Sequence, residues 1–241
     1  MKYYYDLHIH SALSPCGDDD MTPNNIVNMS MLNGLDIIAV SDHNTCANLK
    51  AVKSCADKAG IVFLFGMELE TAEEIHILCL FDNIESALRF ENEMVRTALP
   101  PVKNNEKIFG KQIIFDEQDN QIGTDDRYLI NATSITVDSI DDIIKKYDGV
   151  AIPAHIDKQT KSILSVLGMV DESMGFSSFE LSKNVSDDFT DTQISLKNQK
   201  YTYIHNSDAH YLYDIAERGA KNYFEFANKP TAKEVIEILK G

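Results

Sequence analysis

Histidines and carboxylates recur at the ends of short apolar runs along this chain, and this placement constrains the fold more than any other feature. The first run covers residues 3–10 and carries His8 and His10 with one residue between them. Side chains at positions i and i+2 of a strand point to the same face, so both imidazoles can reach one cation. Leu7 and Ile9 are expected on the opposite, buried face.

Later runs end in the same kinds of side chain. Asp208 and His210 repeat the spacing of the first pair, with a carboxylate and an imidazole on one side. Any one of these histidines by itself is typical of an ordinary core or surface residue, and His205, inside the strand before Asp208, is expected to pack in the core. Taken together, the set indicates a cluster of metal ligands. The polar residues at the ends of predicted strands are His10, His43, Glu68, His155 and Asp208.

The apolar runs alternate with helix-like stretches. Thr22 and Pro23 give the first helix an N-cap and a first-turn proline. About seven or eight β–α units favour a closed parallel barrel over an open sheet, and the functional residues of such barrels lie at the C-terminal ends of the strands. Predicted strands cover residues 3–10, 36–40, 61–65, 74–81, 149–155, 177–181, 201–205 and 223–226, and predicted helices cover residues 22–32, 46–58, 140–146 and 231–240.

The stretch from about residue 84 to residue 137 breaks this alternation. It holds an amphipathic helix at residues 86–98, a Pro100–Pro101 break and a predicted hairpin at residues 116–123. We interpret it as an insertion within a single domain of residues 1–241. It is a candidate lid or substrate selector, since loops on a rigid barrel usually set specificity. Arg127 lies in this stretch, without any feature that separates it from a surface arginine.

Composition limits the cellular setting and the partners. Residues 1–5 lead into a polar segment without the apolar stretch of a signal peptide, and no run approaches the roughly 20 apolar residues of a membrane span. The four cysteines form no C-x-x-C pair, as is typical of reduced thiols, so a cytoplasmic protein that binds no membrane is expected. A net charge of −16 argues against long nucleic acid as a passive ligand. The oligomeric state stays open.

Five short motifs, in order along the chain, resemble those of the polymerase and histidinol phosphatase (PHP) superfamily. The resemblance spans almost the whole chain, from His8 to His210. It implies an α/β fold, a distorted seven-stranded TIM-like (β/α)7 barrel that holds two or three divalent ions. The motifs are Asp-Leu-His-Ile-His-Ser at residues 6–11, Val-Ser-Asp-His-Asn at 40–44, Gly-Met-Glu-Leu at 66–69, Pro-Ala-His at 153–155 and Asn-Ser-Asp-Ala-His at 206–210.

The resemblance also implies a set of ligands for each ion. Asp6 and Asp42 would orient imidazoles through hydrogen bonds. Such nitrogen and oxygen donors suit Mn²⁺, Fe²⁺ or Zn²⁺, and suit Mg²⁺ less well because so many of them are imidazoles. The implied sets are His8, His10, Glu68 and Asp208 for the first metal, His43, His210 and a residue of the loop after the first strand for the second, and Glu68, His76 and His155 for the third.

The loop residue is the least defined member of these sets. Counting back from Pro23 selects Asp18, and Asp19 and Asp20 are alternatives. Cys16 could also face the site, but the preferred interpretation is a small buried residue or an incidental loop thiol.

The function implied is that of a metal-dependent phosphoesterase. Its substrate would be a small phosphorylated molecule: a phosphate mono- or diester of a metabolite, a nucleotide or a short oligonucleotide. The expected chemistry is in-line attack on phosphorus by a hydroxide held between two metals. Asp208 would help to hold the water, and His210 would protonate the leaving group. Lys158 and Arg218 are candidate substrate-binding residues, with ordinary surface positions as an equal alternative.

Two other classes of function stay open at this point. One is a metal-dependent hydrolase of C–N bonds, because related barrels use similar clusters for amide hydrolysis. The other is a non-catalytic metal-binding module. The intact ligand set disfavours the module. The lack of a lysine at a convincing strand end disfavours amide hydrolysis, since barrel amidohydrolases usually carry a lysine that bridges their metals.

Overall fold

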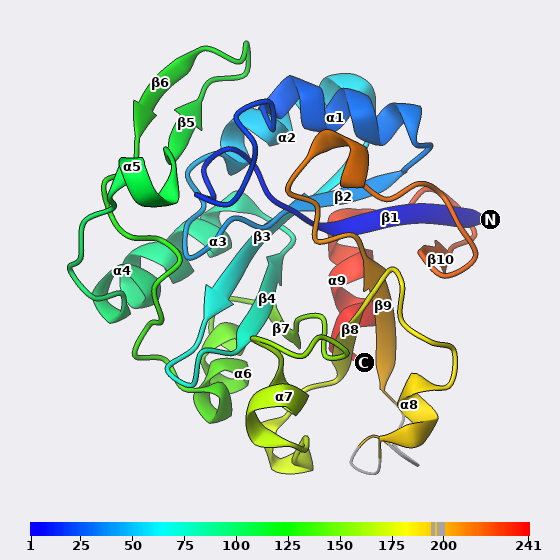
Figure 1. Cartoon of the computed structure of the whole chain (residues 1–241). Helices are drawn as coiled ribbons and strands as arrows, with labels where there is room; N and C mark the ends of the chain where they lie inside the picture. The colour runs from blue at the N-terminus through cyan, green and yellow to red at the C-terminus, as the bar shows by residue number, and fades with distance from the viewer. Residues whose placement is uncertain (194–195, 197–200) are drawn as a thin grey trace.

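A strongly curled sheet forms the centre of the molecule, and helices cover much of its outer face (Figure 1). The computed structural model describes residues 1–193, 196 and 201–241. Its strands are β1 (Lys2–Ile9), β2 (Ile37–Val40), β3 (Val62–Glu70), β4 (His76–Phe81), β5 (Ile113–Phe115), β6 (Gln121–Thr124), β7 (Val150–Pro153), β8 (Ser178–Ser182), β9 (Thr202–Asn206) and β10 (Tyr223–Glu225).

The predicted helices are present with small shifts at their ends, and the short helices α5, α7 and α8 were not predicted. Thr22 caps α1 and Pro23 begins it, as expected, and Thr231 forms a capping box with Glu234 at the start of α9. The helices are α1 (Pro23–Leu32), α2 (Leu49–Ala59), α3 (Ile84–Phe90), α4 (Arg96–Ala98), α5 (Glu106–Phe109), α6 (Val137–Lys145), α7 (Ile163–Leu167), α8 (Phe189–Thr192) and α9 (Ala232–Lys240), with the π-helical turn η1 (Glu91–Val95) and the 3₁₀ turns η2 (Glu172–Met174) and η4 (Leu212–Asp214).

Two groups of paired strands together complete most of a barrel. β10, β1, β2, β3, β4 and β7 form one sheet in that order, and β8 pairs with β9. Beyond the ends of β7, the Ile156 N–H donates to the Glu180 carbonyl of β8 at 2.9 Å. At the other seam, the His10 N–H donates to the Ala209 carbonyl at 2.9 Å. The order β1-β2-β3-β4-β7-β8-β9 therefore curls back on itself, which confirms the predicted α/β fold with a distorted seven-stranded barrel.

One barrel strand runs against the others, so the expectation of a wholly parallel barrel is wrong. β4 pairs antiparallel with both β3 and β7. Only residues 71–75 join β3 to β4, whereas a parallel connection needs a dozen or more residues. Glu70 therefore pairs with His76, and the first residue of β4 lies where β3 ends. The predicted strand at residues 223–226 is β10, which pairs antiparallel with the N-terminal half of β1.

Apolar side chains pack in two layers, one on each face of the sheet. The inner layer joins Leu64 of β3 and Leu78 of β4 to Val235 and Leu239 of α9. The outer layer packs the convex face against α1, α2 and α6. Burial of this apolar area is the main stabilising contribution, at about 25 cal/mol per Å². α9 lies against the inside of the curled sheet (Figure 1), and the polar site described below lies beyond this apolar layer, where Glu68 follows Leu64 along β3.

β1 passes between these two layers. Leu7 lies in the inner layer and Ile9 in the outer layer, and both are fully buried. The register between β1 and β2 shifts between Asp6 and Ile9. The expectation that Leu7 and Ile9 share one face is therefore wrong, because an irregularity in the pairing interrupts the two-residue alternation.

The stretch from residue 84 to residue 137 holds the predicted helix and hairpin. The helix runs without a break through α3, η1 and α4, and the hairpin is formed by β5 and β6 (Figure 1). The Ile113 N–H donates to the Ala12 carbonyl at 2.8 Å, so the hairpin packs on the loop after β1. Whether this stretch is an insertion that acts as a lid stays a prediction.

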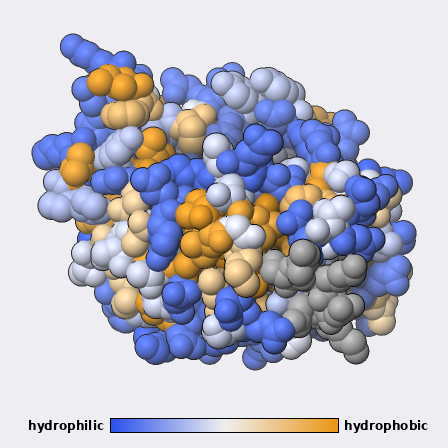
Figure 2. All heavy atoms as spheres, turned by 60° about the horizontal axis from the view of Figure 1, so that its bottom comes forward, coloured by the Kyte–Doolittle hydropathy of each residue, from blue (hydrophilic) through white to orange (hydrophobic). Residues whose placement is uncertain are grey.

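The face that carries α6 and α7 shows a gathering of apolar atoms among hydrophilic ones (Figure 2). Val166 and Leu167 of α7 and the nearby Met169 are exposed. In the part of the chain that the structure describes, no helix has both the length and the apolar character that crossing a membrane requires.

Candidate metal centre

Glu68 stands at the centre of a group of histidines at the open end of the barrel. Its side chain is 1% exposed, and five imidazoles each bring a nitrogen close to its carboxylate. β3 presents Glu68 four residues after Leu64, on the same inner face. The distances from the carboxylate oxygens are 3.3 Å to His8 Nε2, 3.4 Å to His10 Nε2, 3.1 Å to His43 Nδ1, 2.8 Å to His76 Nδ1 and 3.3 Å to His155 Nε2.

Asp208 and His210 join the same group from the loop after β9. Asp208 Oδ1 lies 3.1 Å from His10 Nε2 and 3.5 Å from His8 Nε2. The rings of His10 and His210 stack with centroids 4.3 Å apart. The His210 Nδ1 lies 2.9 Å from the backbone carbonyl of Asp208, which leaves Nε2 as the free ring nitrogen. The segments that follow β1 and β9 thus meet across the seam between these two strands.

Donor atoms of these side chains form three overlapping groups, and within each group all atoms lie within 4.8 Å of one another. The first group is the set that the family resemblance implied for the first metal. The second contains the implied His43 and His210, adds His10, and has Cys16 as its loop residue. The third holds His43 where His155 was implied. The assignment of each ligand stays a prediction. The groups are His8, His10, Glu68 and Asp208; His10, Cys16, His43 and His210; and His43, Glu68 and His76.

Several polar atoms of this cluster lack a partner in the protein, as expected of a cation site. A buried polar atom without a partner costs about 1–3 kcal/mol. Divalent cations bind imidazole nitrogens and carboxylate oxygens, so these buried side chains fit a multinuclear metal site. Among the described residues, the buried atoms without a hydrogen-bond partner include His8 Nε2, His43 Nδ1, Glu68 Oε1, His76 Nδ1 and His155 Nδ1.

Opposite charges keep the carboxylates of the cluster ionised. Burial would raise the pKa of Asp208, but His8 and His10 beside it hold that pKa below its ordinary value. Burial would likewise lower the pKa of His76, yet Glu68 and Glu70 raise it to about 9. A bound cation would take over the role that a proton on such an imidazole plays.

The backbone is left-handed at three residues in or beside the cluster. The φ angles are 51° at Asn44, 31° at His155 and 54° at Asp208. For residues other than glycine, this conformation costs about 1–2 kcal/mol each. Such strain persists where the surrounding structure fixes it, and it gathers at functional sites.

Hydrogen bonds behind the cluster connect Asp42 to one of its histidines through Ser14, and the orienting role predicted for Asp42 stays a prediction. The Ser14 hydroxyl donates to the Asp42 carboxylate at 2.7 Å and lies 2.9 Å from His10 Nδ1. Among the residues that the structure describes, Asp6 has no hydrogen bond or ion pair with an imidazole. It accepts from the Ser207 hydroxyl at 2.6 Å and from the Ala216 N–H at 2.9 Å, so it shapes the loop that carries Asp208.

Glu180 of β8 is a buried carboxylate of the site that the sequence reasoning did not single out. Its two oxygens lie 2.9 Å and 3.0 Å from His8 Nδ1, which turns His8 Nε2 toward Glu68. Glu180 also accepts from the His155 N–H at 2.8 Å and from Asn206 Nδ2 at 2.7 Å. Glu180 belongs to none of the recognised motifs. Its position within a predicted strand was the one feature of the sequence that indicated a role in the site.

Replacing Glu180 with glutamine is expected to weaken metal binding by about 10- to 100-fold, as is typical when a group that orients a ligand is changed. Every partner of the Glu180 carboxylate is a donor, so the amide NH₂ of glutamine would face one of them. Competition with a chelator of known affinity measures the change. Asp171→Asn, at an exposed cap of η2, should leave the affinity unchanged. Equal affinities for Glu180→Gln and the wild type would contradict this role.

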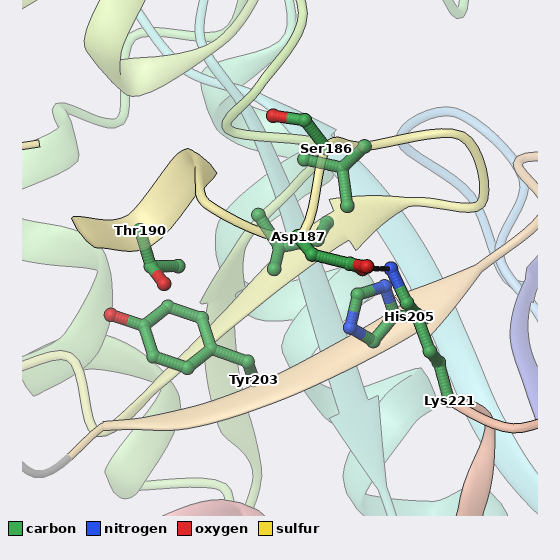
Figure 3. Close-up of a pocket in the computed structure, with 8 residues that line it drawn as sticks. Ser186, Asp187, Thr190, Tyr203, His205 and Lys221 are labelled. Carbon is green, nitrogen blue, oxygen red and sulfur yellow. Dashed lines mark hydrogen bonds and ion pairs between the residues drawn. The ribbon is translucent and has the colours of Figure 1, made fainter. Parts of the chain in front are cut away.

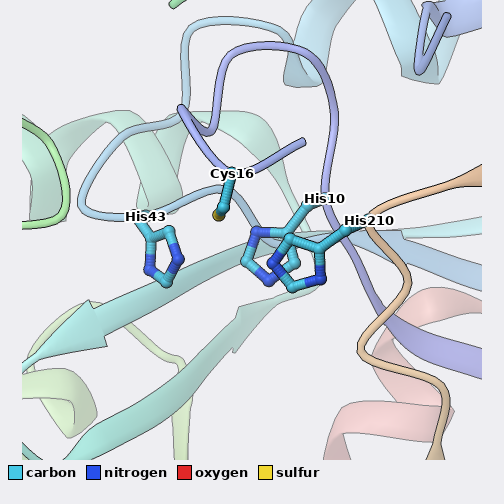
Figure 4. A group of neighbouring side chains, drawn as sticks. All are labelled: His10, Cys16, His43 and His210. Carbon is cyan, nitrogen blue, oxygen red and sulfur yellow. The ribbon is translucent and has the colours of Figure 1, made fainter. Parts of the chain in front are cut away.

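The loop after β1 places Cys16, rather than a carboxylate, beside the histidines (Figure 4). Asp18 Oδ1 instead accepts the Asp20 N–H at 3.0 Å, and Asp19 and Asp20 are exposed. Among the described residues, Asp18 belongs to none of the three groups of donor atoms. The loop geometry therefore does not support the choice of Asp18.

The two predicted substrate-binding residues lie in different places. Lys158 donates to the Asp208 carboxylate and lines the cleft over the cluster, together with Lys161. Lys161, which the sequence reasoning missed, pairs with Glu70 at 2.6 Å. Arg218 is not brought to this cleft. Its guanidinium lies 5.5 Å from the centroid of the Tyr4 ring, against the N-terminal half of β1.

His205 is not a core residue, in contrast to the expectation. Its neighbours Ile204 and Asn206 are buried, so alternation along β9 turns His205 to the opposite face. There it lines a cavity of about 290 Å³ with Tyr203 and Lys221, which pairs with Asp187 (Figure 3). His205 therefore stands apart from the metal cluster.

Comparison with known proteins places this geometry in a family. The family model of the PHP domain matches residues 6–107, from within β1 to beyond β4. A 5′-3′ exoribonuclease of Haemophilus influenzae is 34% identical over 83 residues, which cover 33% of this chain and 29% of that protein. The chain thus spans less than a third of this relative.

Solved structures share the fold over nearly the whole chain. The lesion-specific endonuclease EndoQ of Pyrococcus furiosus aligns with a TM-score of 0.73 and 19% identity, covering 100% of this chain and 56% of that one. A Bifidobacterium adolescentis protein, a candidate metal-dependent phosphoesterase, aligns with a TM-score of 0.57 and 16% identity, covering 98% and 95%. The matched family, the curled barrel and the histidine cluster agree with one another, and the chain carries a PHP domain that is matched over residues 6–107.

Proposed function

We propose that this protein hydrolyses a phosphate mono- or diester by metal-dependent catalysis, and that its substrate is a small metabolite, a nucleotide or the end of a short oligonucleotide. The observation that carries the proposal is the buried cluster around Glu68, which five imidazoles approach to within 3.4 Å at the open end of the barrel. When bound there, divalent cations supply an activated water and neutralise charge on the phosphate oxygens.

The cleft over the cluster is small, which supports the choice of substrate. Its volume is about 120 Å³, and Lys158, Thr160 and Lys161 line it together with the ligands. A space of this size suits a phosphoryl group, so the remainder of the substrate would lie outside. The two lysines would attract the phosphate at the entrance. The names of two relatives, an exoribonuclease and an endonuclease, support a nucleotide or oligonucleotide among these candidates.

The ionisation states of Asp208 and His210 indicate what each side chain would do in catalysis. Asp208 stays ionised because His8 and His10 offset the effect of burial on its pKa, so it is a weak base and would position the attacking water. Burial and the neighbouring His10 lower the pKa of His210 to about 4, so its imidazole is neutral near pH 7. A neutral imidazole binds cations but is a weak acid. These contacts favour a ligand role for His210 over the proposed protonation of the leaving group.

Hydrolysis assays with three substrates test the proposal. An aryl phosphate monoester, an aryl phosphate diester and a 5′-phosphorylated trinucleotide are each incubated with metal-stripped protein, and then after addition of Mn²⁺, Zn²⁺ or Fe²⁺. We expect hydrolysis of at least one ester that needs added metal and stops with a chelator. Cleavage of N-acyl amides without ester hydrolysis would favour the C–N hydrolase alternative. Metal-loaded protein that cleaves none of these compounds would contradict the proposal.

A further inference from the structure

We infer that Cys16 is a thiolate ligand of the centre, in the position that sequence reasoning gave to Asp18; the inference rests on the proposed metal-dependent function. Cys16 Sγ and one nitrogen each of His10, His43 and His210 lie within 4.8 Å of one another. Figure 4 shows the thiol directed toward the three imidazoles. A thiolate and three imidazoles make a complete four-coordinate set of the kind that zinc takes.

A second observation points to a cation beside His43. This side chain is 5% exposed, and its buried Nδ1, which lies 3.1 Å from Glu68 Oε2, has no hydrogen-bond partner among the described residues. The rings of His10 and His43 have centroids 4.8 Å apart, and the His10 ring also stacks on His210. Three imidazoles held this close together can direct their ring nitrogens at one shared cation.

The loop that carries Cys16 is fastened on both sides of it. The Gly17 N–H donates to the Ser14 carbonyl at 2.9 Å, and the Asp18 N–H donates to the His210 carbonyl at 2.9 Å. A Cβ atom at Gly17 would stand 2.4 Å from the carbonyl oxygen of Ser11, so this position excludes any side chain. The backbone therefore holds Cys16 over the histidines and ties its loop to the Asp208–His210 loop.

Sulfur in this position changes which metals the centre prefers. Thiolates are soft ligands that favour Zn²⁺, Fe²⁺ or Co²⁺ over Mg²⁺ and Mn²⁺. The first group of ligands, with Glu68 and Asp208, contains no sulfur. We therefore expect two kinds of site in one centre, with the thiophilic ion bound at Cys16.

Cobalt substitution tests the sulfur–metal bond directly. Metal-stripped wild-type protein loaded with Co²⁺ should show the near-ultraviolet absorption of thiolate-to-metal charge transfer. Cys16→Ser should lose this absorption and bind one ion fewer. Cys16→Asp should keep the number of bound ions without the absorption, and should shift the preference from Zn²⁺ toward Mn²⁺ by about tenfold or more. Cys55→Ser, a buried cysteine next to Asn24 and outside the cluster, should behave as wild type.

Alkylation gives a second measurement that needs no variant. Of the four cysteines, Cys16 is exposed and Cys46, Cys55 and Cys79 are buried, so iodoacetamide should label Cys16 first. Zn²⁺ should slow this labelling at least tenfold, whereas Mg²⁺ should not. Full Co²⁺ binding without charge transfer, charge transfer that persists in Cys16→Ser, or labelling that Zn²⁺ does not slow would overturn the inference. Charge transfer in a protein that cleaves no ester would instead support Cys16 as a metal ligand and contradict the proposed function.

Discussion

Replacing Glu68 with glutamine is expected to lower kcat/KM for the best ester substrate by on the order of 1,000-fold. Among the described residues, the Glu68 carboxylate is the one acidic group that all five imidazoles share, at 2.8 to 3.4 Å from their nitrogens. The amide of glutamine keeps the shape but removes the negative charge. It also offers a single acceptor oxygen where two of the three donor groups use Glu68. We therefore expect the bound-metal count to fall as well, as measured by elemental analysis after dialysis.

Glu70→Gln is the matched control for this prediction. Glu70 lies two residues further along the same face of β3, is also buried, and pairs with Lys161. It approaches one imidazole of the cluster, at 3.5 Å from His76 Nε2. Its replacement should lower kcat/KM by about tenfold or less, as is typical of groups that surround metal ligands. If the two variants lose the same amount of activity, or if Glu68→Gln keeps its metals, Glu68 is not the central ligand of the metal site.

The ligand cluster was predictable because its signal is local and repeated. Two histidines at strand spacing, with similar residues at later strand ends, give the same answer from different parts of the chain. To place His76 in the cluster, the direction of its strand also had to be known, because His76 begins a strand and does not end one. The five residues between β3 and β4 are too few for a crossover, and that length alone would have indicated the antiparallel turn.

The missed features depend on contacts that sequence spacing does not record. Glu180 was not found, because a carboxylate within a strand gives no hint that it faces an imidazole from another strand. The nearness of Cys16, rather than Asp18, to the histidines was not predicted for a similar reason. Counting from a helix start assumes a regular loop, whereas the Gly17 approach to Ser11 bends this one. Arg218 follows the Asp208 loop in sequence, but it turns away to pack on Tyr4.

Arg127 was indistinguishable from a surface arginine in the sequence, yet the structure gives it a structural role. Its Nη2 lies 3.2 Å from Oε1 of Glu91, which is 1% exposed. Glu91 also accepts from the Cys46 N–H at 3.0 Å and from the Thr45 hydroxyl at 3.2 Å. The pair therefore links two parts of the stretch from residue 84 to residue 137 with the loop that carries His43.

Arg127→Met is expected to lower the free energy of unfolding by about 2–3 kcal/mol, because it leaves the Glu91 carboxylate buried with less compensation. The loss stays below the upper range for broken buried pairs, since Arg96 still approaches Glu91 at 3.3 Å. Urea denaturation measures the change. The double variant Glu91→Gln with Arg127→Met should lose less than the sum of the single variants, by about 1 kcal/mol or more, because contacting residues are coupled.

Lys103→Met provides the control from the same stretch of chain. Lys103 pairs with Asp126 at 3.2 Å, but both side chains are largely exposed, so its removal should change stability by about 0.5 kcal/mol or less. Both variants replace a cationic side chain beside a carboxylate with methionine. The difference between their stabilities therefore reports the effect of burying the ion pair. The Glu91 network also holds the Thr45 hydroxyl and the Cys46 N–H, two and three residues after His43, so Arg127→Met should weaken metal binding and Lys103→Met should not. Equal stability and equal metal affinity in the two variants would mean that the buried pair does not support the metal centre.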